Sequence, residues 1–297
     1  MWESLLSGIV KGDRKNLARS ISFIENEVPG YEGFLASLPV NNSCPVIGIT
    51  GPPGAGKSTL TDAIIANLIK EKKRIGVLCV DPSSPFHRGA LLGDRIRMSE
   101  WYNHEDVFIR SLASRGALGG LHPHIIEICD LLKAAQFDWI ILETVGVGQS
   151  EVEIASLSDI SIVTFVPEAG DEIQAMKAGL MEIGDVFVVN KADRPGADLF
   201  VKNLRMTMAP AFYHNKKDIP VLKTIATERS GIDELVSVIN ALLAQPAHAE
   251  KKIMLQAEKA FYLIQQKRMK DIERGALVEK IKALGTSFNL YRFVEGY

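Results

Sequence analysis

This sequence of 297 residues has few cysteines, no large excess of positive or negative charge, and no long hydrophobic run. The three cysteines, Cys44, Cys79 and Cys129, form no C-x-x-C pair, so neither a disulfide framework nor a zinc site is expected. Hydrophobic runs such as residues 46–50 and 139–142 fall far short of the ~20 residues that cross a bilayer. We therefore expect a protein of the reducing cytoplasm with no membrane-spanning segment and no signal peptide.

Basic and acidic side chains are nearly balanced, with 34 Lys or Arg against 36 Asp or Glu and a net charge of −2. Such a balance gives no general attraction to nucleic acid or to an anionic membrane, so neither is expected as a partner. Apolar residues make up 46% of the chain and charged residues 24%, which are the proportions of a globular protein and exclude collagen-like and disordered chains.

Short β-rich runs alternate with helical stretches from Pro45 onward. This alternation predicts an α/β fold with a doubly wound, mostly parallel sheet, whose ligands lie at the carboxyl ends of the strands. The expected strands are residues 46–50, 75–80, 107–111, 138–143, 160–166, 186–190 and 221–225.

Helical segments flank the expected sheet at both ends of the chain. The spacing of apolar residues predicts two short helices within residues 4–27 and further helices over 253–272 and 277–284. Residues 251–297 carry ten Lys or Arg against five Asp or Glu, so this arm is locally basic, and it either packs on its own domain or joins a partner. We expect an N-terminal helical extension at 1–42, a central α/β domain at 43–246 and a C-terminal helical arm at 247–297.

The strongest motif is G-P-P-G-A-G-K-S at residues 51–58, which fits the phosphate-loop pattern G-x-x-x-x-G-K-[ST]. It follows the expected strand 46–50 and precedes a helical stretch, which is the context that the motif requires. The glycines let backbone N–H groups surround phosphate oxygens, Lys57 adds a positive charge, and Ser58 is the expected Mg²⁺ ligand. The predicted phosphate-binding residues are Gly51, Pro53, Gly54, Ala55, Gly56, Lys57, Ser58 and Thr59.

A second motif, N-K-A-D at residues 190–193, follows an apolar run and indicates which base is bound. At a strand end, the Asp193 carboxylate can accept hydrogen bonds from N1–H and the 2-amino group of guanine, whereas adenine offers no donor at either position. Losing such a pair in a buried site costs enough to reject ATP strongly. Asn190, Lys191 and Asp193 therefore predict a guanine site, with the stem of Lys191 along the face of the ring.

A third element, W-I-I-L-E-T-V-G at residues 139–146, is suited to sense the γ phosphate. Glu143 can hold Mg²⁺ through a water and the Gly146 amide can donate to the γ phosphate, so this loop would move when that phosphate leaves. The alternative is a surface glutamate at a strand end. Asp81 and Asp94 are further candidates near the metal, although Asp81 can equally cap a turn and Asp94 can begin a helix.

Together these motifs resemble the MeaB/ArgK-type GTPases, a branch of the signal-recognition-like P-loop GTPases associated with methylmalonyl-CoA mutase. The run E-T-V-G-V-G-Q-S at 143–150 is highly specific, and the resemblance covers nearly the whole chain. It is carried by residues 51–59, 80–85, 92–98, 143–151, 170–174, 177–182 and 190–193, with the upstream segments 11–14 and 17–22.

The resemblance implies roles for further residues. Asp94 would be a Mg²⁺ ligand in the first switch, with Asp81 close to the metal. The base-contacting loop would include Ala226 and Thr227, although residues 226–231 form a shorter loop than is usual in the family. Residues 170–179 would form an extra switch that relays the nucleotide state to the mutase, and its candidate residues are Gly170, Asp171, Gln174 and Lys177.

The resemblance also implies what the protein does. It would bind GTP and GDP with Mg²⁺ and act as a chaperone for an adenosylcobalamin-dependent mutase of the methylmalonyl-CoA type. In that role it would gate delivery of the cofactor, protect the mutase from inactivation, and work as a homodimer built partly with the C-terminal arm, which is short here.

Catalysis is expected to be electrostatic, because Lys57, Mg²⁺ and the loop amides can stabilise charge on the γ phosphate while water attacks. Gln149 is a candidate to position that water, and it can equally be a polar residue at the start of a helix. Arg95, Arg97 and Arg110 are either a charge clamp or ordinary surface arginines. We expect slow intrinsic hydrolysis that a partner accelerates.

Two other functions remain open on the sequence. A small-molecule kinase, such as the arginine/ornithine transport ATPase or kinase after which some members are named, would use the same phosphate loop but needs an acceptor pocket and a general base. A nickel or cobalt metallochaperone GTPase would need metal ligands, and His122 and His124 are the suggestive pair.

Overall fold

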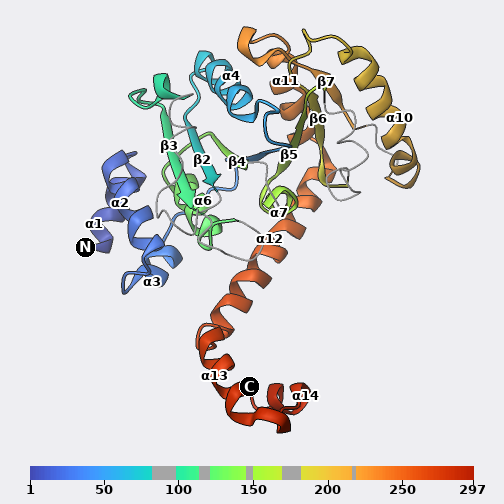
Figure 1. The fold of residues 1–297 in the computed structure, drawn as a ribbon. Coiled ribbons are helices and arrows are strands. Elements are labelled where there is room, and N and C mark those ends of the chain that lie inside the picture. Colours follow the sequence, from blue (N-terminus) through green and yellow to red (C-terminus); the bar gives the residue numbers. More distant parts are fainter. Residues whose placement is uncertain (82–97, 114–120, 145–149, 169–181, 216–218) are drawn as a thin grey trace. The chain divides into compact units, whose positions relative to one another are not determined.

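The computed structural model describes residues 1–81, 98–113, 121–144, 150–168, 182–215 and 219–297. Its centre is a sheet with the strand order β3-β2-β4-β1-β5-β6-β7, in which every pairing between the described strands is parallel (Figure 1). This confirms the doubly wound α/β fold. The strands are β1 (Val46–Thr50), β2 (Ile75–Asp81), β3 (Val107–Ala113), β4 (Trp139–Thr144), β5 (Ile160–Phe165), β6 (Val186–Val189) and β7 (Val221–Lys223).

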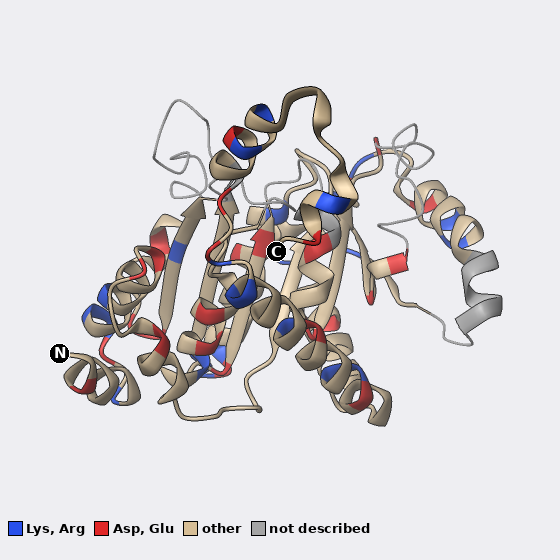
Figure 2. Cartoon of the chain, turned by 90° about the horizontal axis from the view of Figure 1, so that it is seen from below, with Lys and Arg blue, Asp and Glu red and all other residues tan. Residues whose placement is uncertain are grey.

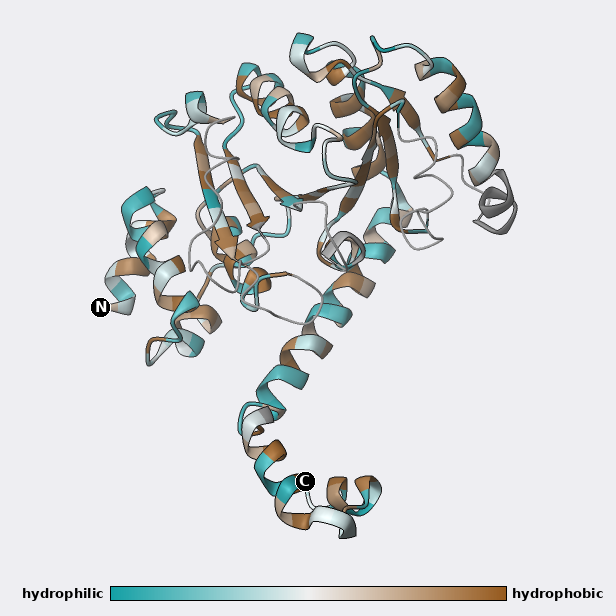
Figure 3. Ribbon diagram, in the orientation of Figure 1, coloured by the Kyte–Doolittle hydropathy of each residue, from teal (hydrophilic) through white to brown (hydrophobic). Residues whose placement is uncertain are grey.

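Helices cover both faces of the sheet, and the strand residues are apolar on both sides because both faces are buried (Figure 3). On one face, α4 (Lys57–Lys70) and α11 (Ile232–Leu243) pack on a cluster that contains Ile47, Val77 and Ile141. On the other face lie α6 (Ile125–Ala134), α7 (Ser150–Leu157) and α10 (Ala197–Asn215). Two glycines, Gly48 and Gly76, allow α7 and α6 to approach the strands closely.

Three helices, not the expected two, precede the sheet: α1 (Trp2–Val10), α2 (Arg14–Glu25) and α3 (Tyr31–Ala36). The additional helix, α3, has six residues and starts after Gly30, whose φ of 91° turns the chain into it. Phe34 is buried and stacks on Trp2 with 4.8 Å between ring centroids. A contact with a residue far away in sequence thus stabilises a segment that is too short to be predicted from its own spacing.

The chain divides into two compact units, Met1–Leu255 and Gln256–Tyr297. The helix α12 (Pro246–Arg268) begins in the first unit, where Lys251 Nζ donates to Asp185 Oδ2 at 2.6 Å and to the Asp159 carbonyl at 3.1 Å. The second unit continues with α13 (Arg274–Leu284), the short 3₁₀ segment η3 (Gly285–Ser287) and α14 (Leu290–Val294). The three-part division expected from the sequence stays a prediction.

Charged residues of both signs are interspersed along the helices drawn in Figure 2, in agreement with the balanced composition. In the part of the chain that the structure describes, no helix has the length and apolar character needed to span a membrane.

Candidate nucleotide site

Those predicted residues of the phosphate loop and of the N-K-A-D motif that the structure describes lie, with Glu143, at one edge of the sheet. Because all paired strands among the described residues are parallel, the carboxyl ends of β1, β4, β6 and β7 lie at the same edge of the sheet. Glu143 in β4 is level with Ile49 in β1 and with Cys79 in β2, so its side chain lies just below the phosphate loop. Asp81 ends β2 at this edge, opposite Ala113 of β3.

The phosphate loop has the backbone geometry that its glycines were expected to allow. Gly51, Gly54 and Gly56 have φ values of 137°, 79° and 85°, in the region that side chains disfavour. A Cβ on Gly51 would lie 2.1 Å from the Thr164 carbonyl oxygen, and one on Gly56 would lie 2.4 Å from Asn190 Nδ2. A larger residue at Gly51 would therefore displace β5, and one at Gly56 would displace the side chain of Asn190.

Lys57 is the first residue of α4 and lies inside the phosphate loop. It is only 6% exposed, and its Nζ donates to the Gly51 carbonyl at 2.7 Å and to the Pro52 carbonyl at 3.0 Å. The ammonium group thus bridges the two ends of the loop at the amino terminus of a helix. Positive charge and helix-end N–H groups are together the requirement for holding phosphate.

Glu143 is buried beneath the start of α4 and accepts hydrogen bonds from two hydroxyl groups of that helix. Ser58 Oγ donates to Oε1 at 2.5 Å, and Thr61 Oγ1 donates to Oε2 at 2.9 Å. Glu143 is 3% exposed, so these bonds lie out of bulk water. It is therefore not the solvent-exposed strand-capping glutamate that the sequence left open.

The donor set fits Mg²⁺. Mg²⁺ binds oxygen ligands, commonly one or two carboxylates with phosphate oxygens and water. Ser58 and Glu143 place a hydroxyl and a carboxylate together beside the phosphate loop. The described residues contain no cluster of three or more His, Cys, Asp or Glu that could hold a metal ion.

Asn190 connects the phosphate loop to the segment after β7. Its side chain is buried, and Nδ2 donates to the Ala55 carbonyl at 3.1 Å. Its Oδ1 accepts from Thr224 Oγ1 at 3.1 Å and from the Ala226 amide at 3.2 Å. Asn190 thus holds two loops together.

Lys191 and Asp193 lie on the turn that follows Asn190. Lys191 has a φ of 55° and donates from Nζ to the Gly54 carbonyl at 2.8 Å, so its stem crosses toward the phosphate loop. Asp193 is exposed, as is Thr227, whereas Ala226 is buried. The segment that begins with Ala226 is the short 3₁₀ helix η2 (Ala226–Glu228), which the Ala226 amide ties to Asn190.

Several predicted residues fall outside the described part of the chain. These are Asp94, Gly146, Gln149, Gly170, Asp171, Gln174 and Lys177, together with Arg95 and Arg97; for Asp81 only the backbone is described.

Arg110 and the two candidate metal-ligating histidines lie beside glutamates at the end of the N-terminal helices, Arg110 and His122 next to Glu25 and His124 next to Glu27. Arg110 Nη2 lies 2.5 Å from Glu25 Oε2, which makes this arginine part of a structural ion pair. His124 Nδ1 lies 3.1 Å from Glu127 Oε1, and hydrogen bonding to Glu127 raises the pKa of this histidine despite its burial. The His124 amide donates to His122 Nδ1 at 3.1 Å, so this nitrogen of His122 is engaged by the backbone.

Two threonines of the site were missed at the sequence level. Thr61 lies three residues after Ser58 on a helix and therefore shares its face, which is the signal that could have identified it. Thr224 precedes η2 and donates to Asn190. Each of them contacts a site residue that is distant in sequence, Glu143 for Thr61 and Asn190 for Thr224, and only the strand order brings these pairs together.

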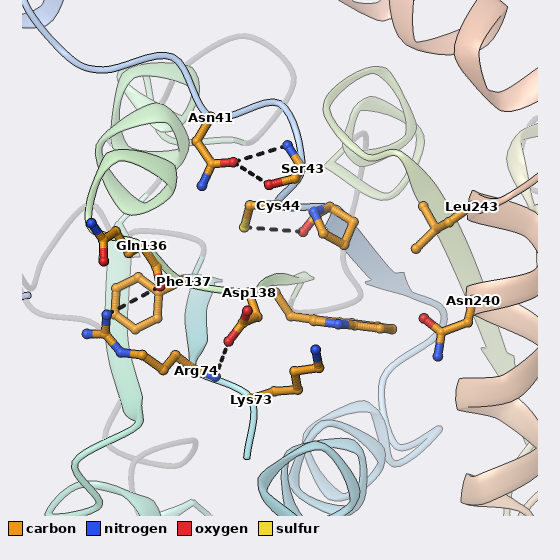
Figure 4. Close-up of a pocket in the computed structure, with 12 residues that line it drawn as sticks. Asn41, Ser43, Cys44, Lys73, Arg74, Gln136, Phe137, Asp138, Asn240 and Leu243 are labelled. Carbon is orange, nitrogen blue, oxygen red and sulfur yellow. Dashed lines mark hydrogen bonds between the residues drawn. The ribbon is translucent and has the colours of Figure 1, made fainter. Parts of the chain in front are cut away.

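A cavity of about 580 Å³ lies away from this site, near the amino ends of β2 and β4 (Figure 4). Its lining includes Lys73, Arg74 and Trp139, and Arg74 already donates to the Ala135 and Gln136 carbonyls. Burial raises the pKa of the thiol of Cys44, which also lines the cavity, to about 12, so this group stays protonated.

Comparisons with known proteins agree with this geometry. The model of one protein family, described as "Methylmalonyl Co-A mutase-associated GTPase MeaB", matches residues 17–278. A putative GTPase of Pyrococcus abyssi is 41% identical over 288 residues, which are 96% of this chain and 84% of that protein.

Two further similarities concern a solved structure and a larger enzyme. The crystal structure of a LAO/AO transport system kinase superposes with a TM-score of 0.68 and 27% identity, covering 96% of this chain and 87% of that one. A fused isobutyryl-CoA mutase of Cupriavidus metallidurans is 39% identical over 197 residues, which are 65% of this chain but only 18% of that protein. The similar segment is therefore a small part of that enzyme.

Proposed function

This chain belongs to the MeaB family of methylmalonyl-CoA mutase-associated GTPases, and on that basis we propose that it is a GTP-hydrolysing switch and chaperone for an adenosylcobalamin-dependent acyl-CoA mutase. The observation that carries the proposal is that Asn190, the first residue of the N-K-A-D motif, donates to the phosphate loop at Ala55 and accepts from Ala226 in η2. Through this link, one nucleotide can engage both motifs at the same edge of the sheet. In this role the protein gates cofactor loading and protects the mutase.

The bound nucleotide is GTP or GDP. Asp193 lies on the turn beside the phosphate loop. The contacts of Asn190 with Ala55 and of Lys191 with Gly54 hold this turn in position. The Asp193 carboxylate accepts the two donors of guanine and finds none on adenine. Ala226 and Thr227 complete the base site from η2.

Hydrolysis relies on positioning and charge. The loop amides and Lys57 bind the phosphates, and Lys57 stabilises the negative charge that develops on the γ phosphate. Ser58, oriented by Glu143, would hold Mg²⁺ together with phosphate oxygens, and the ion would supply further charge stabilisation. Asp81, Asp94, Gly146 and Gln149 are proposed to complete the metal and γ-phosphate contacts, and residues 170–179 to relay the nucleotide state.

A mutase is the proposed partner because a relative carries a segment similar to this chain inside a fused isobutyryl-CoA mutase. Two domains that occur within one polypeptide in one organism often act together as separate chains in another. Binding to a mutase of the methylmalonyl-CoA or isobutyryl-CoA type is therefore the first interaction to test.

The C-terminal unit supports the proposal of a homodimer. Phe261, Ile264 and Tyr291 are 66%, 52% and 81% exposed, and α12 and α14 have no buried residue. Apolar side chains in such number are normally covered by a partner. A second copy of this chain would bury them without requiring another protein.

The experiment is single-turnover GTP hydrolysis, with and without an adenosylcobalamin mutase of the same organism. We expect a low rate that rises when the mutase is added, while Lys57→Ala gives the background from contaminating enzymes. An unchanged rate together with no complex in sedimentation would contradict the chaperone role.

The name of the solved relative favours one alternative, a kinase of an arginine/ornithine transport system. A kinase would transfer labelled phosphate from the nucleotide to arginine or ornithine, whereas the proposed GTPase would release it only as inorganic phosphate. The same labelled reaction separates the two functions.

A further inference from the structure

The acid that lies beneath the phosphate loop is a glutamate, and it is held at both of its oxygens. Ser58 and Thr61 stand three residues apart in α4, so their hydroxyl groups leave the same face of the helix. One donates to Oε1 of Glu143 and the other to Oε2, at 2.5 and 2.9 Å. Both hydroxyl residues and the carboxylate are buried.

This arrangement gives the two oxygens of Glu143 different tasks. Oε1 accepts the proton of Ser58, so the direction of this bond orients Ser58 Oγ, the expected ligand of the cation. Oε2 accepts from Thr61, and this bond fixes the rotation of the carboxylate and so the direction of Oε1. Glutamate has one more rotatable bond than aspartate, so a second donor has more conformational freedom to remove.

Thr61 is well suited to act as that donor. Its side chain is completely buried, and of the two χ1 rotamers that threonine favours in a helix, the one adopted here directs the hydroxyl at Glu143. A hydrogen bond to a charged carboxylate out of water is among the stronger ones in proteins.

We infer that Thr61 is a positioning residue for Mg²⁺, which acts through Glu143 on Ser58 and sets the affinity of the nucleotide complex for the ion. The inference rests on the proposed GTPase function but concerns a residue outside the phosphate-loop motif. Partners of metal ligands commonly contribute 10- to 100-fold to metal affinity, and Thr61 is expected to contribute in this range.

The test measures GDP affinity by calorimetry across a series of Mg²⁺ concentrations and in EDTA. Thr61→Val, and Thr61→Ala as a smaller variant, should shift the Mg²⁺ midpoint upward by roughly 10- to 100-fold while GDP affinity in EDTA stays near wild type. Thr61→Ser should restore the midpoint. Ser158→Ala is the matched control, since that buried hydroxyl donates to the Ile154 carbonyl in α7 instead.

A double-mutant cycle identifies the route. In a Glu143→Gln background, Thr61→Val should leave the Mg²⁺ midpoint unchanged, because its effect passes through the carboxylate. An unchanged midpoint in Thr61→Val, or a Thr61→Ser variant as weak as Thr61→Val, would overturn the inference. A wild-type chain that binds no GDP would instead refute the proposed function itself.

Discussion

The phosphate loop and the base loop meet at the same edge of the sheet but differ in how their polar groups are held. Around the phosphate loop, Lys57, Ser58 and Glu143 are buried and bonded to one another or to backbone. In the N-K-A-D turn, Asn190 is buried and bonded to the phosphate loop and to the segment after β7, whereas Asp193 is exposed. The phosphate half of the site is therefore held by buried contacts among its own residues, while the base half, formed by the N-K-A-D turn and η2, depends on the contacts of Asn190 and Lys191 and leaves its base-reading carboxylate exposed.

This difference indicates a division of labour. A preorganised phosphate half supplies affinity for any nucleoside triphosphate at little entropic cost. The base half adds selectivity through a carboxylate that has to be placed correctly. Changes in the first region should therefore abolish binding, and changes in the second should alter which nucleotide is bound.

The largest effect is expected from Lys57→Ala. Removing the ammonium takes away charge-assisted hydrogen bonds to phosphate, so the affinity for GTP and for ATP should both fall by about 100- to 1000-fold. Calorimetric titration measures this, with the exposed Lys70→Ala at the other end of α4 as the control. A variant that loses affinity for GTP but retains affinity for ATP would contradict the assignment of general triphosphate binding to the phosphate loop.

A smaller but broader effect is expected from Asn190→Ala. The change leaves the Ala55 carbonyl and the Ala226 amide without their buried partner, and it should destabilise the fold by about 2–4 kcal/mol. It should also weaken GTP binding, because both loops lose their common support. Urea unfolding and titration measure the two effects, and the exposed Asn203→Ala should change neither. Full GTP affinity in the Asn190 variant would show that the halves are independent.

The smallest effect is expected at His124, which lies outside both the phosphate loop and the base-binding region. The hydrogen bond to Glu127 raises the pKa of His124 above its ordinary value of 6.5, and the charges of Glu127 and Glu27 add to this. The stabilisation is therefore fully present below pH 6.5 and is lost as the pH rises through the higher pKa of the folded state.

His124→Gln should remove this part of the pH dependence, which is worth less than about 1 kcal/mol for such a partly exposed pair. Urea unfolding of both proteins at about pH 6 and about pH 8.5 provides the measurement. GTP affinity should stay equal in the two proteins. A change in affinity would mean that the nucleotide site is coupled to the N-terminal helices.

Much of the fold and of the phosphate half could be predicted because the information is local. Continuous apolar runs mark buried parallel strands, and the loop motif contains its own glycines, lysine and serine. The helical spacing of Ser58 and Thr61 indicates that the two share a face, but the contact of Thr61 with Glu143 could not be predicted, since it requires β4 to lie next to β1. The helix α3 was missed because Trp2, far away in sequence, supplies the surface on which Phe34 packs.

The measurement that bears most directly on the account is a calorimetric comparison of GTP and ATP, with Mg²⁺, on the wild-type chain and on Asp193→Asn. The wild type should prefer GTP by at least about 100-fold, and the variant should lose most of that preference while still binding triphosphate. The exposed Asp198→Asn serves as the control. A wild type that prefers ATP, or a variant with unchanged selectivity, would contradict the convergence of a phosphate loop and a guanine-reading turn on one nucleotide.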